Sequence, residues 1–130
     1  MYAKIRVLLA SRPKLLSEVL RYMLARQPDM EVISEVLDPI ELLLAVQATS
    51  AEVVIVTPLP ANGDPHICVQ LLAAYPQLKI VTQSAKGEAA YLYQSGSPKM
   101  LIEEPSEHSM LGAIREALRD GRRTEGNGSE

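Results

Sequence analysis

The chain has 130 residues, 47% of them hydrophobic, which suits one domain with an ordinary core and leaves little room for a second. Its net charge of −3, with acidic and basic residues mixed, argues against the clustered basic face that nucleic-acid binding requires. No apolar run has membrane-spanning length, and the single cysteine, Cys68, cannot form an internal disulfide, so we expect a protein of the reducing cytoplasm.

The first predicted elements are a strand and an amphipathic helix. Residues 4–10 are apolar and partly β-branched, as in a buried strand. Ser11 is a suitable residue to cap a helix, and Pro13 suits the first helical turn. Six apolar residues then recur at helical spacing and predict one buried face: Leu15, Leu16, Val19, Leu20, Met23 and Leu24.

A second and a third strand, residues 31–36 and 52–57, flank the next predicted helix. Three signals coincide at the start of that helix. Asp38 can cap it, Pro39 suits its first position, and Glu41 completes a capping box. This agreement makes the start of the helix the most sharply defined boundary in the sequence.

The pattern of strands and helices continues beyond the third strand. Residues 64–72 predict a helix and residues 79–84 a fourth strand. Residues 88–94 predict a short fourth helix closed by Gly96, and residues 99–103 a fifth strand.

Ser106 caps the last predicted helix, whose inner face holds Met110, Leu111, Ile114 and Leu118. Five strand–helix units in succession predict a parallel sheet with helices on both faces. The expected fold is therefore α/β, a doubly wound, flavodoxin-like sheet of five parallel strands in the order 2-1-3-4-5 between two helical layers. It occupies residues 1–120, and the polar residues 121–130 are expected to form a flexible tail.

Ligands of such a sheet bind beyond the carboxyl ends of the strands, where the strand order reverses. Here that point lies between the first and third strands, so the predicted site contains Ser11, Arg12 and Thr57. Ser84 and Glu103, at the ends of the fourth and fifth strands, complete its rim. We call these five positions the strand-end row.

Residues 5–36, IRVLLASRPKLLSEVLRYMLARQPDMEVISEV, resemble the opening of bacterial response-regulator receiver domains, especially those of LuxR-type regulators. The resemblance continues more loosely to Ala117. It implies two acidic residues after the first strand that hold Mg²⁺, and an aspartate after the third that accepts a phosphoryl group. It also implies a Thr or Ser after the fourth strand, a Lys after the fifth, and an aromatic residue three positions before that Lys.

The chain keeps only one of these groups, the hydroxyl of Ser84. The other positions are occupied as follows: Ser11 and Arg12 replace the acidic pair, Thr57 the phosphoacceptor, Glu103 or (one residue later) Glu104 the Lys, and Met100 the aromatic residue. Mg²⁺ requires carboxylate ligands, and phosphoryl transfer requires that ion and fixed cations. We therefore expect a degenerate receiver that is no enzyme and uses no Mg²⁺, other metal or cofactor.

The charges at two of these positions are exchanged relative to the family, with Arg12 after the first strand and Glu103 after the fifth. We expect the two side chains to pair across the strand ends, although two separate solvated charges remain an alternative. Arg12 and Lys14 at a helix start could also attract an anion, but the segment lacks the glycine of a phosphate-binding loop.

A candidate interaction face contains Tyr91 and Tyr93 of the predicted fourth helix and Met100. In receivers this region commonly serves for pairing or partner docking, so the resemblance implies such a role here. An ordinary half-buried helix is an equal alternative.

The sequence thus favours a phosphorylation-independent regulatory module that binds a signalling protein or a second copy of itself, with no nucleic-acid or membrane partner. The alternative is a sensor that binds a small anion or nucleotide at the strand ends.

Overall fold

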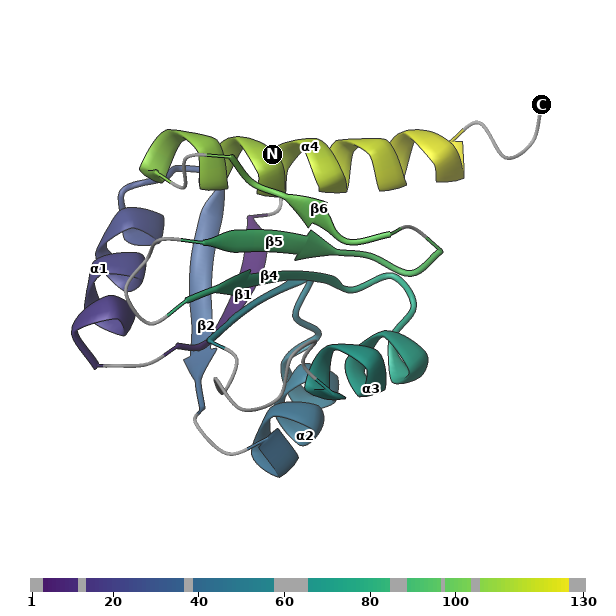
Figure 1. Ribbon diagram of the computed structural model, residues 1–130, viewed down its shortest axis with the longest axis horizontal. Helices are drawn as coiled ribbons and strands as arrows, with labels where there is room; N and C mark the ends of the chain where they lie inside the picture. The colour runs from purple at the N-terminus through teal and green to yellow at the C-terminus, as the bar shows by residue number, and fades with distance from the viewer. Residues whose placement is uncertain are drawn as a thin grey trace.

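The computed structural model describes residues 4–11, 14–36, 39–57, 66–84, 89–96, 98–103 and 106–126. Within these residues strands and helices follow one another along the chain (Figure 1). Their bounds are β1 Ile5–Ala10, α1 Lys14–Ala25, β2 Met30–Glu35, α2 Pro39–Thr49, β3 Val53–Val56, α3 His66–Ala74, β4 Lys79–Gln83, β5 Ala90–Tyr93, β6 Met100–Leu101 and α4 Glu107–Gly126.

One mixed sheet connects the described strands, in the order β2-β1-β3-β4-β5-β6. The first four strands are parallel, with Ala10 opposite Val56 and Val56 opposite Thr82. β5 is antiparallel to β4, and β6 is antiparallel to β5. The carboxyl ends of β1 to β4 and of β6 therefore lie at one edge of the sheet, where β5 begins.

Helices cover both faces of this sheet, as the alternation predicted. In Figure 1, α4 lies along the top of the view and α2 and α3 lie together below the sheet. Side chains of α1 and α4 pack on one face, around Val7, Ile55 and Leu92. Side chains of α2 and α3 pack on the other, around Leu8 and Val54. Neighbouring residues of one strand thus enter opposite cores, as the pleat requires.

The prediction of a helix at residues 88–94 and of a five-stranded parallel sheet was wrong. The segment forms β5, in which Ala90 and Leu92 are buried while Tyr91 and Tyr93 are half-buried on the other side. This period of two suits a strand, and four residues are too few to distinguish it from a helix by pattern alone. Gly96, with φ of 80°, lies in the turn to β6 instead of closing a helix.

The predicted face of α1 is only half buried. Leu20, Met23 and Leu24 are buried, but Leu15 and Val19 are 70% and 55% exposed. The helix therefore presents an apolar surface that no described element covers.

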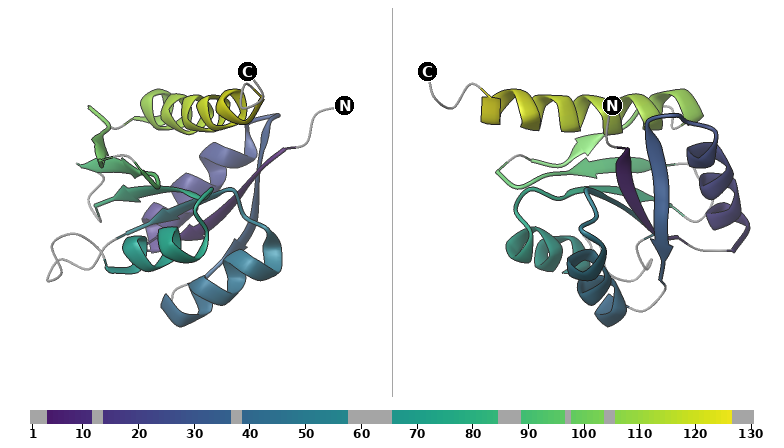
Figure 2. Two further views of the ribbon diagram at one scale, coloured as in Figure 1. Left: turned by 90° about the vertical axis from the view of Figure 1, so that its right-hand side faces the viewer. Right: turned by 180° about the vertical axis from the view of Figure 1, so that it is seen from behind.

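α4 has the predicted cap, because the backbone N–H of Ser109 donates to Oγ of Ser106 and that of Ser106 donates to Oγ of Ser109. Its four predicted inner residues are all buried. The helix continues to Gly126, six residues into the segment expected to form the tail. The rear view in Figure 2 shows α4 lying across the end of the sheet where β2 begins.

Candidate functional site

The structure brings described members of the strand-end row to one edge of the sheet. Ser11 directly follows β1 and Thr57 directly follows β3, and the N–H of Thr57 donates to the carbonyl of Ala10 at 3.2 Å. Ser84 follows β4 and lies one residue beyond the level of Thr57, because Val56 is opposite Thr82. Parallel strands end side by side, so this part of the prediction follows from the order of the first strands.

Ser11 is part of the structural framework of this edge. Its side chain is 1% exposed, and its Oγ donates a 3.2 Å hydrogen bond to the carbonyl of Ile55 in β3. A buried hydroxyl needs such a partner, and here the partner is backbone. The side chain of Ser11 thus links β1 to β3.

Ser84 organises the start of β5. Its N–H donates to the carbonyl of Ala89 at 2.9 Å, and its Oγ accepts a 3.1 Å hydrogen bond from the N–H of Ala89. The N–H of Ile102 in turn donates to the carbonyl of Ala90. The backbone and hydroxyl of Ser84 therefore hold the antiparallel strand beside β4.

Glu103 is exposed beyond the end of β6. Arg12 and Glu104 lie outside the described residues, so the pairing of Arg12 with Glu103 stays a prediction.

A carboxylate that the sequence reasoning did not select lies at this same edge. Glu35 is the last residue of β2. Its side chain accepts a 2.6 Å hydrogen bond from Oγ of Ser17 and forms an ion pair with Arg21, and both of these residues lie on α1. The hydrogen bond from Arg21, then that from Ser17, lower the pKa of Glu35 below its usual value, and Lys14 adds a weaker attraction. The acid is therefore ionised and already neutralised by α1. The sequence signal that could have identified Glu35 was its position near the end of the predicted second strand, residues 31–36.

The proposed interaction residues are divided between the two faces of the sheet. Tyr91 and Tyr93 alternate with the buried residues of β5, and Tyr93 packs in the core beside α3. Met100 pairs with Leu92, so the pleat places it on the opposite face from Tyr91. The ammonium of Lys99 lies 4.9 Å from the centre of the Tyr91 ring. The helical part of this prediction was wrong, and the role of these residues in a protein contact stays a prediction.

Met100 and Leu101 nonetheless form an exposed apolar edge, because their side chains are 49% and 53% exposed on β6. β6 is the last strand of the described sheet. An edge strand with apolar side chains is a natural contact surface for another protein.

Among the residues that the structure describes, no group of three His, Cys, Asp or Glu side chains could hold a metal ion. Within the same ranges, no helix combines the length and apolarity needed to cross a bilayer. Cys68, on α3, is buried in the core between that helix and the sheet.

One curated relative resembles the chain over most of its length. It is YxjL of Bacillus subtilis (strain 168), described as an uncharacterized transcriptional regulatory protein, and it is 27% identical over 120 residues. The match covers 89% of this chain and 55% of the relative, so the chain spans little more than half of that protein's length. No protein-family model matches the chain.

Proposed function

We propose that the chain is a degenerate receiver-like domain with a regulatory role in signalling, and that it acts through protein contacts without being phosphorylated. The similarity to a transcriptional regulatory protein supports the regulatory role. The observation that supports action without phosphorylation is that the two strand-end hydroxyls are engaged in hydrogen bonds to the backbone. Oγ of Ser11 bonds the backbone of β3, and Oγ of Ser84 bonds the backbone at the start of β5.

This arrangement is unsuited to phosphoryl transfer. Thr57 replaces a carboxylate at the end of β3, and the carboxylate of Glu35 at the same edge is occupied by Arg21 and Ser17. Mg²⁺ would find no open pair of acidic ligands among the described residues of the row. The proposal therefore includes no catalysis and no cofactor, in a cytoplasmic setting that suits the single, buried Cys68.

The contact surface that we propose is the β6 edge, with Met100, Leu101 and the ring of Tyr91. Its occupant is a signalling protein or a second copy of the chain. Sedimentation at rising concentration distinguishes the two, and Leu101→Lys is expected to weaken either contact without unfolding the domain. Unchanged association in that variant would exclude this edge.

Amide-shift titration of the labelled chain with Mg²⁺ and beryllofluoride tests phosphorylation independence. We expect no shifts at Ser11, Thr57 or Ser84. A variant carrying Arg12→Asp, Thr57→Asp and Glu103→Lys restores carboxylates and a cation, and it serves as the control that the titration can detect binding. Saturable shifts in the unmodified chain would overturn the proposal. The same titration with phosphate and nucleotides tests the ligand-sensor alternative.

A further inference from the structure

An apolar groove lies between α1 and the start of α4, on the opposite side of the sheet from α2 and α3. It encloses about 420 Å³, and its walls include Leu16, Val19 and Met23 of α1 and Met110 of α4. Pockets for small molecules are about 300–1,000 Å³ in volume and mostly apolar, with a few polar groups that orient the ligand. The groove has this size and this composition.

Gln83 supplies a polar group to this groove. It is the last residue of β4, only 7% of it is exposed, and it lines the groove. Its Oε1 atom is buried and accepts no hydrogen bond from the described residues. A buried carbonyl oxygen without a donor is unfavourable, and nearly all such groups in folded proteins are paired. The unpaired acceptor thus belongs to a residue of the groove wall, and an N–H or O–H group of an occupant would satisfy it once the amide turns toward the groove.

The charges at the rim indicate what kind of occupant fits. Arg26 and Glu107 both line the groove, and they form an ion pair with each other. The guanidinium of Arg26 also lies 5.1 Å from the centre of the Tyr22 ring. Arg26 and Glu107 neutralise each other, and the third charged residue of the lining, Glu18, is exposed, so solvent screens its charge. The rim therefore disfavours an anionic ligand and attracts a cationic one only weakly.

We propose that this groove binds a small, neutral, amphipathic molecule, whose apolar body lies along α1 and whose N–H or O–H group donates to Oε1 of Gln83. The site is separate from the proposed protein contact at β6 and does not depend on it. Gln83 directly precedes Ser84, which holds the start of β5, so the groove adjoins the strand-end row through one peptide bond.

Two matched probes test the donor requirement. 4-Propylphenol carries a hydroxyl donor, and 4-propylanisole has a similar body but cannot donate. In amide-shift titrations of the full chain, we expect both to shift residues of α1, the start of α4 and Gln83. The phenol is expected to bind about tenfold more tightly, or about 1.4 kcal/mol. In Gln83→Met this preference is expected to disappear, whereas Gln70→Met on exposed α3 surface should retain it.

Three outcomes would overturn the proposal: no groove shifts with either probe up to its solubility limit, equal affinity for both probes in the unmodified chain, or a preference that survives Gln83→Met. A concentration-dependent dimer with α1 protected would instead assign the groove to a second copy. Val19→Arg provides an independent test if Gln83→Met does not fold. Val19 is 55% exposed, so the larger side chain fits the fold, and it is expected to abolish binding of both probes.

Discussion

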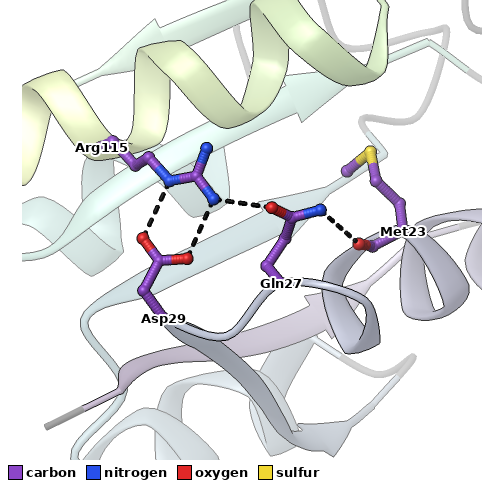
Figure 3. A network of polar contacts seen from close by, with 4 residues as sticks. All are labelled: Met23, Gln27, Asp29 and Arg115. Atoms are coloured by element: carbon purple, nitrogen blue, oxygen red, sulfur yellow. Dashed lines mark hydrogen bonds and ion pairs between the residues drawn. The ribbon is translucent and has the colours of Figure 1, made fainter.

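Arg115 of α4 donates two hydrogen bonds to Asp29, which lies in the turn before β2 (Figure 3). Nε donates to Oδ2 at 2.8 Å, and Nη2 donates to Oδ1 at 2.9 Å. Nη2 also donates to Oε1 of Gln27 at 2.7 Å, and the amide of Gln27 reaches the carbonyl of Met23 at the end of α1. One guanidinium thus joins the last helix to the connection between α1 and β2. Two-pronged pairs of this kind are the stronger form of surface ion pair.

The contribution of this pair can be measured in a double-mutant cycle of Arg115→Met and Asp29→Asn. Both side chains are more than a third exposed, so solvent screens the interaction. We expect a coupling of about 0.5–1 kcal/mol in urea unfolding. The same cycle on the more exposed pair of Arg26 and Glu107 is the control, and we expect a smaller coupling free energy there. Additive effects at Arg115 and Asp29 would mean that the pair contributes nothing.

Acid is expected to weaken the fold through two carboxylates. The hydrogen bond from Arg115 lowers the pKa of Asp29, and that from Arg21 lowers the pKa of Glu35. Both groups then bind fewer protons in the folded than in the unfolded chain, so stability rises with pH. Their contribution is complete above the unfolded pKa values, about 4, and is lost as the pH falls through the lower folded values. Urea unfolding at pH 7, 4 and 3 measures the loss, which should be smaller for Asp29→Asn with Glu35→Gln.

Replacement of Leu92 tests the course of β5. Leu92 is 1% exposed in the core against α4, so Leu92→Ala is expected to lower the free energy of unfolding by about 3 kcal/mol. Tyr91→Ala, at a half-buried neighbour on the other face, is the matched control and is expected to lower the free energy of unfolding by less. Hydrogen exchange adds a second test, because the N–H of Ile102 donates to Ala90 and is expected to be protected. Rapid exchange there would contradict the antiparallel pairing.

Gln83→Met is expected to stabilise the empty protein by about 0.5–1 kcal/mol, because it removes a buried acceptor that has no donor while keeping a side chain of similar length. Thermal unfolding measures the change, with Gln70→Met as the neutral control. A clear loss of stability in Gln83→Met would show that the amide has a structural partner.

The sequence was sufficient for the elements whose boundaries carry several independent signals. Pro39 begins α2 as expected, and Ser106 caps α4 with the expected inner face. The parallel strands were recognisable from β-branched runs, as in Val53–Val56. The assembly of Ser11, Thr57 and Ser84 at one edge followed from that order alone.

Elements that depend on tertiary partners could not be predicted in the same way. Ala90–Tyr93 is too short to show its period, and its pairing with β4 decides its conformation. Leu15 and Val19 fit a buried stripe by spacing, but only Leu20, Met23 and Leu24 of that stripe reach the core that α1 shares with the sheet and α4. Gln83 had no sequence signal, because its importance comes from burial without a donor.

The antiparallel course of β5 also bears on the order in which the chain can fold. β4, β5 and β6 follow one another in sequence and pair in that order, whereas the parallel pairs are joined by crossovers that contain a helix. Closing a longer loop costs more conformational entropy, and topologies rich in local contacts fold faster. The meander of β4 to β6 can therefore form from local contacts alone and offer a template on which β3, β1 and β2 dock in turn.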